Sequence, residues 1–381
     1  MRQFCFTLLL LWGIPCLAAD VVHLTEGKHS VKATIGDEVF TVMQFSDDRK
    51  KPFFLPVTAA GGIELLKAGK PDAAEGEPGR KVIICSERPQ VTNQEAGLGL
   101  NDVVEISDVI GHWLKISDKE CWIHRSDVAP IAATVTRLIN DNPPRIKDRS
   151  SPLYYDHPHH KGIWLSVDEV NGIKFWNEDG EIRTKSVEIV TAKGNPAVLK
   201  RTTHWLGENG KPLVEEVSTW SLYANRLITA DITFTAQTDV TFGDTKEGMF
   251  AIRLPNSMRE MVSGGPVNGA SGDSGSGELW GKLNRWIDYC GPVGNQTFGV
   301  TLMDHPQNPR PSRYHVRNYG LFAINPFGQK SYTGGNEKLP ANPLELAPGE
   351  STRFRYGLFV HSGTTEPKQV EAAFQQFVSQ D

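Results

Sequence analysis

The stretch Leu227-Ile228-Thr229-Ala230-Asp231-Ile232-Thr233-Phe234-Thr235-Ala236 alternates apolar and polar side chains along its whole length. Successive side chains of a β-strand point to opposite faces, so this period of two predicts a strand with one buried and one polar face. Similar runs occur at 30–45, 186–191, 213–222, 249–254, 298–303 and 353–361, separated by Gly, Asn, Asp and Pro. Many half-buried strands joined by loops are typical of antiparallel sheets. The sequence therefore predicts an all-β fold built as a large antiparallel β-sandwich.

The end of the chain shows a different period. Pro367 is suited to the first turn of a helix, and apolar residues follow at spacings of three, four and seven, namely Val370, Ala373, Phe374 and Phe377. This pattern predicts one amphipathic C-terminal helix. The segment 262–281, in contrast, is so rich in glycine and serine that we expect a flexible loop that does not pack.

A second, smaller domain is expected inside the sandwich. Residues 67–80 are rich in Lys, Pro, Gly, Ala and Glu, which is typical of a linker. Short apolar runs follow at 82–84, 102–106, 112–116 and 121–124, and their succession resembles a bacterial SH3-like barrel. We therefore expect a discontinuous sandwich domain at 20–67 and 150–381, with an SH3-like barrel at 79–131 inserted between its parts.

Residues 1–19 have the composition of a secretory signal peptide. Arg2 precedes an apolar run, and Ala18-Ala19 supply a small-residue cleavage site. The sequence thus predicts export to the periplasm or the extracellular space, and no later apolar run is long enough to serve as a transmembrane anchor. The formal net charge of −5 argues against nucleic acid as a partner.

Three cysteines follow the predicted leader. Cys85 and Cys121 are candidates for a disulfide in an oxidising compartment, and whether they pair stays open. Cys290 lies between Tyr289 and Gly291 in an apolar context, which predicts a buried thiol.

Three of the eleven histidines fall within the segment Tyr155-Asp156-His157-Pro158-His159-His160-Lys161-Gly162. Imidazole is the side chain best suited to move protons near neutral pH or to bind a metal. Proline fixes one φ angle and removes a backbone donor. The segment therefore predicts a rigid loop that presents imidazoles at a functional site, although a turn whose polar groups satisfy one another would contain the same residues.

Other segments place polar groups where the strands of a sandwich would end. They are 244–253, 286–291, 304–309, 314–320 and 325–328, and Asp304-His305-Pro306 repeats the Asp-His-Pro of the histidine loop. Functional residues concentrate on loops held by a rigid scaffold. We therefore expect some of these groups to share a site with the histidine loop.

The order of these motifs resembles a secreted bacterial family known as PmoA-like, after the label methane oxygenase PmoA. The resemblance covers 40–67 and 154–361. The motifs that carry it lie at 156–162, 171–176, 246–253, 286–291, 304–308 and 319–328. The resemblance implies a sandwich of the galactose-mutarotase type and a role in carbohydrate processing. Methane oxygenation belongs to hydrophobic membrane proteins, so it is not implied for a chain without an expected membrane span.

Acid–base chemistry on a sugar needs a proton donor and a proton acceptor on opposite sides of the ring. His157, His159, His160 and His305 are the candidate donors, and Glu247 is the candidate base. We expect the remaining ligand contacts from aromatic faces, paired guanidinium donors and polar side chains, namely Trp164, Trp286, Arg253, Arg317, Asp156, Asn308 and Asn325.

Two other functions fit the same residues. His157, His159 and His305 offer nitrogens for a divalent metal of the zinc or copper type, which would make the protein a metal-dependent enzyme. A non-catalytic protein that binds a glycan or the cell wall would need only the binding residues and the SH3-like insert. The sequence favours a carbohydrate-active isomerase or hydrolase that needs no metal, and it leaves both alternatives open.

Overall fold

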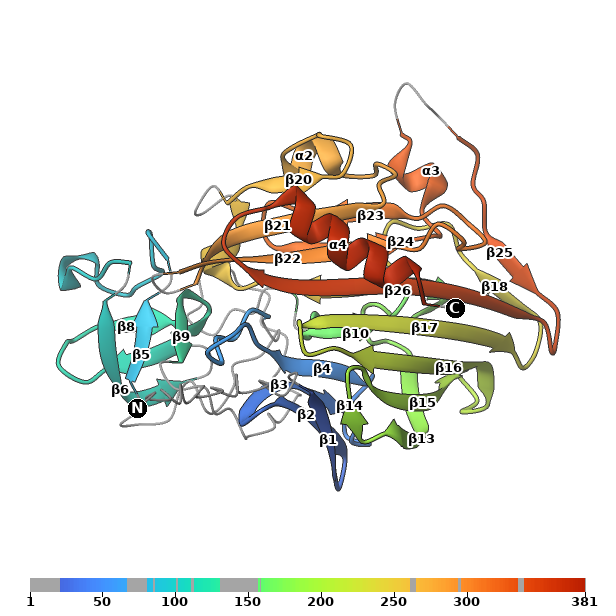
Figure 1. Ribbon diagram of the computed structural model, residues 1–381, viewed down its shortest axis with the longest axis horizontal. Helices are drawn as coiled ribbons and strands as arrows, with labels where there is room; N and C mark the ends of the chain where they lie inside the picture. Colours follow the sequence, from blue (N-terminus) through green and yellow to red (C-terminus); the bar gives the residue numbers. More distant parts are fainter. Residues whose placement is uncertain are drawn as a thin grey trace, which may run out of the picture.

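The computed structural model describes residues 21–66, 81–84, 86–100, 102–110, 113–130, 157, 159–260, 265–293, 296–334 and 339–380. Most of their β-strands belong to two large antiparallel sheets (Figure 1). The first sheet has nine strands, in the spatial order β14 (Lys193–Gly194), β1 (Val22–Gly27), β2 (Ser30–Ile35), β3 (Glu38–Gln44), β4 (Phe53–Val57), β10 (Ile163–Leu165), β19 (Phe250–Arg253), β24 (Leu321–Asn325) and β23 (Arg313–Val316).

The second sheet has eight strands, in the order β13 (Glu181–Thr191), β15 (Ala197–Leu206), β16 (Pro212–Leu222), β17 (Leu227–Ala236), β26 (Ser351–Ser362), β22 (Gln296–Asp304), β21 (Trp286–Val293) and β20 (Val267–Gly269). β17 is the predicted alternating stretch. Its inward residues are at most 1% exposed, namely Ile228, Ala230, Ile232, Phe234 and Ala236. They join one hydrophobic core that includes residues of both sheets. The predicted all-β sandwich is therefore confirmed, and the other alternating runs also coincide with strands.

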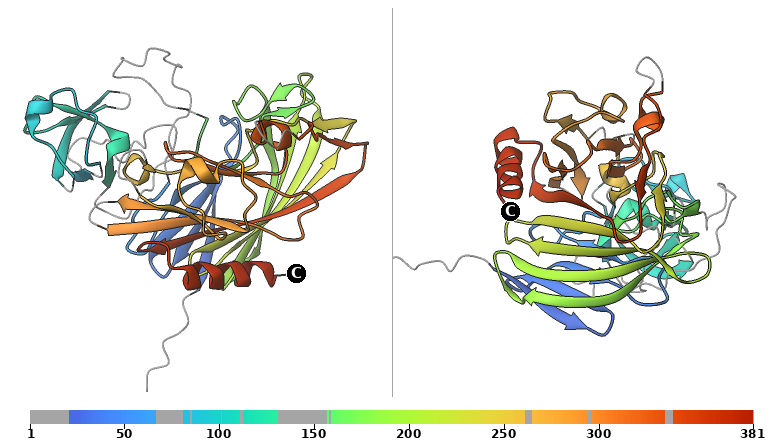
Figure 2. Two further views of the ribbon diagram at one scale, coloured as in Figure 1. Left: turned by 90° about the horizontal axis from the view of Figure 1, so that it is seen from above. Right: turned by 90° about the vertical axis from the view of Figure 1, so that its right-hand side faces the viewer.

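Two smaller sheets complete the β-structure. One contains β12 (Ile173–Lys174), β11 (Glu169–Val170), β18 (Val240–Phe242) and β25 (Leu344–Leu346). The other contains β8 (Trp122–His124), β7 (Trp113–Ile116), β6 (Val103–Ile110), β5 (Lys81–Ile84) and β9 (Val128–Pro130). This five-stranded sheet has a hydrophobic core of its own and lies at one end of the molecule (Figure 2). Its identity as an SH3-like insert stays a prediction.

The helices of the described chain are few and short. α4 (Pro367–Val378) packs on the outer face of the second sheet, where its predicted apolar stripe contacts Trp286, Met303 and Phe359 (Figure 1). The predicted C-terminal helix is thus confirmed. The remaining helical turns are α2 (Ser276–Leu279), α3 (Gln329–Tyr332), η1 (Gln94–Ala96), η2 (Arg125–Asp127) and η3 (Asn256–Met258).

The prediction that 262–281 does not pack is wrong for the part that the structure describes, 265–281. β20 pairs with β21, and Val267 and Leu279 are fully buried. The backbone N–H and the hydroxyl of Ser276 both donate to the carboxylate of Glu260. Pairing with β21 and the hydrogen bonds to Glu260 therefore hold this segment in place, although its glycines have no side chains to pack.

Cys290 is fully buried, as predicted. The predicted signal peptide lies outside the described residues, as does Cys85, so the pairing of Cys85 with Cys121 stays a prediction. Over the ranges that the structure describes, no helix is both long and apolar enough to cross a bilayer.

Candidate functional site

Four neighbouring strands of the nine-stranded sheet form the floor of the candidate site. The register of β10, β19, β24 and β23 places Trp164, Ala251, Ala323 and His315 side by side in one row. Directly opposed residues point to the same face of a sheet. Phe250, the neighbour of Ala251, stacks on an aromatic ring of β26, so the row faces away from the other sheet. Two alanines thus lie between a tryptophan and a histidine, and all four residues are at most 1% exposed.

Two arginines lie on the same face. Arg253 pairs with Leu321 of β24, and the backbone N–H of Arg317 donates to the carbonyl of Leu321 from the other side at 2.9 Å. The backbones of the two arginines are thus separated by one strand, which corresponds to about 10 Å. The guanidinium carbon of Arg253 lies 5.0 Å from the ring centre of Tyr319, and that of Arg317 lies 5.0 Å from the ring centre of Trp280.

The histidine loop adds a column of stacked rings above Trp164. The ring of His160 lies 5.1 Å from that of Trp164, His157 lies 4.7 Å from His160, and Tyr319 lies 5.4 Å from His157. The three interplanar angles are between 4° and 19°. His157 adopts a left-handed backbone conformation with a φ of 51°. The column joins the loop to the face of the sheet.

Arg253 fixes the protonation of His160. Its Nη1 donates to Nδ1 of His160 at 2.9 Å. Burial, together with the charge of Arg253, lowers the pKa of His160 well below its ordinary value. A neutral ring whose Nδ1 accepts carries its proton on Nε2. Within the described chain, this Nε2 has no hydrogen-bond partner, so His160 offers an unused N–H donor.

A buried ionic cluster supports the loop from below. Lys51 is 1% exposed, and its Nζ donates to the carbonyl of His159 at 2.7 Å. One carboxylate oxygen of Glu178 lies 2.7 Å from Nζ of Lys161 and 3.3 Å from Nζ of Lys51. Burial lowers the pKa of Lys51 to about 8. Burial would raise the pKa of Glu178, but the charges of the two lysines lower it to about 2.

Glu247 precedes β19 and reaches His315 of β23. Its Oε2 lies 3.4 Å from Nδ1 of His315, and Nε of Arg317 donates to Nε2 of His315 at 3.1 Å. Burial lowers the pKa of His315 to about 3, so the ring is neutral, and because Nε2 accepts from Arg317 the proton is on Nδ1. Within the described chain, Nδ1 makes no hydrogen bond, although it lies near Glu247. Burial also raises the pKa of Glu247, although the charge of Lys246 opposes this shift.

Backbone contacts hold Glu247 in place. The side-chain amide of Asn325 donates to the carbonyl of Thr245 at 2.9 Å and accepts from the backbone N–H of Phe327 at 2.9 Å. The backbone N–H of Asp168 donates to the carbonyl of Glu247 at 2.8 Å. Asn325 is 1% exposed, so it supports the segment before β19 and does not present its amide to a ligand as predicted.

The residues of this face divide by exposure. The partly exposed ones are His157, Glu247, Trp280, Arg317 and Tyr319, and the buried ones are His160, Trp164, Arg253 and His315. A ligand would therefore meet a carboxylate, a guanidinium group and aromatic rings, which the buried groups orient. A carboxylate with a raised pKa beside a neutral imidazole is suited to accept and return a proton.

Of the predicted site residues, the structure brings His157, His159, His160, Trp164, Glu247, Arg253 and Arg317 to this face. It places three others at the second sheet, two of them in contact with α4. The ring of His305 contacts Phe377, the amide of Asn308 bonds to the carbonyl of Arg355, and Nε1 of Trp286 donates to Glu371. The prediction that they share the site is corrected, because β22 and β21 belong to the other sheet. Asp156 lies outside the described residues.

The predicted metal set His157, His159 and His305 is not brought together. Among the described residues, one group of three potential ligands converges within 4.8 Å, and it consists of Asp288, Cys290 and His361 on the second sheet. The predicted set is not brought together because His305 follows β22 of the second sheet, whereas the histidine loop precedes β10 of the first.

Sequence reasoning missed His315, Lys51 and Glu178. A usable signal existed for His315, because His315 and Arg317 alternate with Tyr314 and Val316, and alternate residues of a strand share a face. No comparable signal existed for Lys51, which meets Glu178 across 127 positions of sequence.

A search of curated proteins finds no match. Solved structures with similar strand arrangements include galactose 1-epimerase from Lactobacillus acidophilus, with a TM-score of 0.34, 8% identity, and coverage of 90% of this chain and 98% of that one. A putative aldose 1-epimerase from Escherichia coli K12 has a TM-score of 0.30, 11% identity, and coverage of 90% and 99%. These scores are too low to assign an activity to this chain.

One family model matches a long continuous region of this chain. It begins next to β9 and ends within α4, so it includes the histidine loop, Glu247 and both arginines of the candidate site. Residues 130–375 match the family of unknown function DUF6807, and because this match spans more than half of the chain, the protein belongs to that family.

Proposed function

We propose that the chain is an exported carbohydrate-processing protein that binds a sugar on this face and moves protons between Glu247 and the histidine loop. The observation that supports this most directly is the contact of Glu247 with neutral His315, which Arg317 fixes from behind. Export to the periplasm or beyond rests on the predicted signal peptide alone. The PmoA-like resemblance is compatible with a sugar ligand, and methane oxygenation is no part of the proposal.

The exposed groups suit the two surfaces of a sugar ring. Tyr319 and Trp280 offer aromatic faces for its C–H groups, and Arg317 offers paired donors for hydroxyls or for the carboxylate of a uronic acid. Ala251, Ala323, Trp164 and His315 are at most 1% exposed, so a ligand would meet the partly exposed groups above this row and not the row itself.

The reaction that we propose is the interconversion of the two anomers of an aldose. Glu247 accepts the proton of the anomeric hydroxyl while a loop imidazole, of which His157 is partly exposed, donates a proton to the ring oxygen. The bond between the anomeric carbon and the ring oxygen opens and closes again on the opposite face, which returns both protons. Arg317 keeps the neutral ring of His315 beside the carboxylate of Glu247 through both steps.

The test follows the rate of anomer interconversion in a panel of aldoses and uronic acids by nuclear magnetic resonance. Glu247→Gln should lower the catalysed rate by about 10²–10⁴-fold, the range expected when a positioned acid or base is lost. Glu345→Gln is the matched control, because Glu345 is an exposed carboxylate on β25, away from the face. It should leave the rate unchanged.

Calorimetry with the same sugars separates catalysis from binding. Saturable binding to the wild-type chain that Glu247→Gln weakens, without any turnover, would contradict the enzymatic part and indicate a glycan-binding protein. Absence of both binding and turnover across the panel would overturn the proposal.

A further inference from the structure

The second sheet carries a polar cluster on its outer face, near α4. Cys290 of β21 pairs with Gly299 of β22, and Gly299 pairs with His361 of β26, so the three residues form one row across three strands. Asp288 lies two residues before Cys290 and therefore points to the same face. The side chains of Asp288, Cys290 and His361 are all buried.

The donor atoms of this cluster are spaced like the ligands of one ion. Nε2 of His361 lies 3.0 Å from Oδ1 of Asp288, and Sγ of Cys290 lies 3.2 Å from Oδ2 of Asp288. All three ligand atoms lie within 4.8 Å of one another. Tetrahedral zinc with bonds of about 2.0–2.3 Å separates its ligands by about 3.3–3.8 Å. The cluster thus needs only small shifts to surround a zinc ion.

Gly299 keeps the space between the imidazole and the thiol open. Residues separated by one strand have backbones about 10 Å apart, so their side chains meet only if the strand between them leaves room. A Cβ on Gly299 would lie 2.2 Å from Nε2 of His361 and 3.0 Å from Sγ of Cys290. Glycine weakens the interior of a strand and often marks a close approach. Gly299, which has no side chain, therefore allows these two ligands to converge.

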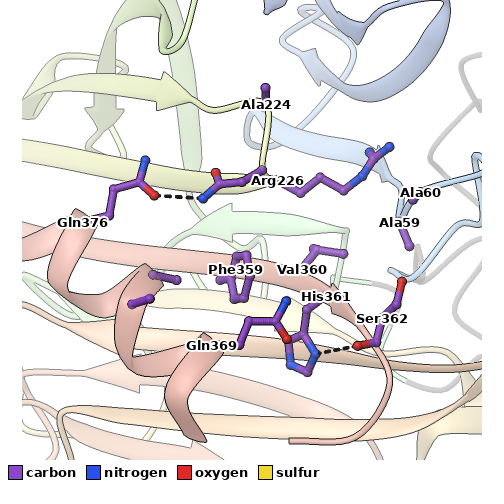
Figure 3. Close-up of a pocket in the computed structure, with 13 residues that line it drawn as sticks. Ala59, Ala60, Ala224, Arg226, Phe359, Val360, His361, Ser362, Gln369 and Gln376 are labelled. Atoms are coloured by element: carbon purple, nitrogen blue, oxygen red, sulfur yellow. Dashed lines mark hydrogen bonds between the residues drawn. The ribbon is translucent and has the colours of Figure 1, made fainter. Parts of the chain in front are cut away.

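The surroundings of the cluster resemble the outer contacts of a metal site. Nδ1 of His361 lies 3.3 Å from the carbonyl of Ser362, to which it can donate, and this leaves Nε2 for an ion. The hydroxyl of Thr301 donates to Oδ1 of Asp288 at 2.9 Å. A pocket of about 510 Å³ between α4 and the turn before β17 extends to His361 (Figure 3). Of the three residues in the cluster, His361 lines this pocket, so the cluster adjoins it on one side.

We propose that Asp288, Cys290 and His361 bind a divalent ion of the zinc type. A carboxylate, a thiolate and a neutral imidazole balance the charge of Zn²⁺, so the buried site is neutral overall. The mixture of sulfur, nitrogen and oxygen ligands favours zinc over magnesium or calcium. Water or the hydroxyl of Thr365, 3.4 Å from Sγ of Cys290, completes the coordination. The ion links β21 to β26 next to α4 and is independent of the sugar-binding face.

The test uses the full chain, stripped with a chelator and kept reduced, and titrates it with Co²⁺ in place of zinc. Wild-type protein should bind one equivalent with a thiolate-to-cobalt charge-transfer absorption, which a surface histidine cannot produce. Cys290→Ser should lose this absorption and bind zinc more than about tenfold more weakly. Cys121→Ser is the matched control, because Cys121 is an equally buried cysteine that directly precedes β8, and it should keep the absorption.

Two further measurements keep the proposal falsifiable if Cys290→Ser fails to fold. Zinc should displace cobalt from the wild-type chain and raise its Tm, and Gly299→Ala should bind cobalt more weakly than wild type. Absence of the thiolate absorption in wild-type protein would overturn the proposal. So would its persistence in Cys290→Ser or its loss in Cys121→Ser.

Discussion

Replacement of Glu178 by glutamine should destabilise the protein and release the histidine loop. The change removes the carboxylate that faces Lys51 and Lys161, whose side chains are 1% and 3% exposed. Removing one partner of a buried ion pair costs about 3–5 kcal/mol, because the remaining charge is left uncompensated. The pKa of Glu178, lowered from 4.5 to about 2, corresponds to about 3 kcal/mol. We therefore expect the free energy of unfolding to fall by about 3 kcal/mol at pH 7.

Urea unfolding followed by tryptophan fluorescence measures this loss. The matched control is Glu181→Gln, because Glu181 pairs with Lys50 and Arg183 at a surface where its side chain is 30% exposed. Exposed ion pairs contribute about 0–1 kcal/mol, so this variant should lose little. The double variant Glu178→Gln/Lys51→Met removes one uncompensated charge and should recover part of the stability. Equal losses of unfolding free energy in Glu178→Gln and Glu181→Gln would refute the reasoning.

The pH dependence gives a second test of the same cluster. The folded pKa of Glu178 lies below its ordinary value, so its contribution to stability is present above pH 4.5 and is lost as the pH falls through about 2. Wild type should therefore lose more stability than Glu178→Gln over that interval. Lys51 has the opposite sign. Its pKa is lowered to about 8, so its charge opposes folding below pH 8, and stability should rise between pH 8 and 10.5.

Gly162→Ala should lower the free energy of unfolding by more than about 2 kcal/mol, because a Cβ there would lie 1.9 Å from the carbonyl oxygen of Phe54 at a φ of +52°. Gly172→Ala, at a φ of +80° in open space, should cost only about 1 kcal/mol, and equal costs in urea would contradict the crowding argument. Any sugar-converting activity should increase as the pH rises through the raised pKa of Glu247, above 4.5, while His315 stays neutral above about pH 3. A rate that stays constant as the pH rises above 4.5 would argue against Glu247 as the base.

The alternating runs predicted the sandwich because burial imposes a period of two on every strand that has one face in the core. β17 begins and ends at the predicted residues, and the apolar stripe of α4 is buried as expected. The prediction that the glycine-rich segment does not pack was wrong over 265–281, because composition describes only the side chains, whereas β20 is held by backbone hydrogen bonds to β21. Hydrogen bonds of the main chain leave no trace in composition.

The site was harder to predict than the fold, and the two Asp-His-Pro motifs show why. The one at 304 has the same three residues as the one at 156, yet His305 follows β22 of the second sheet whereas His157 precedes β10 of the first. Which sheet a strand joins depends on pairing with distant strands, and a local motif does not encode it. The pair of Glu178 with Lys51 depends on the same long-range information.

The two proposed sites have a common structural origin that a sequence can reveal once the register is known. In each, small residues occupy the middle of a row across neighbouring strands, and larger functional side chains stand on either side. Ala251 and Ala323 separate Trp164 from His315 by two strands, and all four residues are buried beneath the partly exposed groups of the face. A single glycine separates Cys290 from His361, so the imidazole and the thiol approach each other over it. The number of small residues in the row therefore decides whether the flanking side chains stay apart or converge.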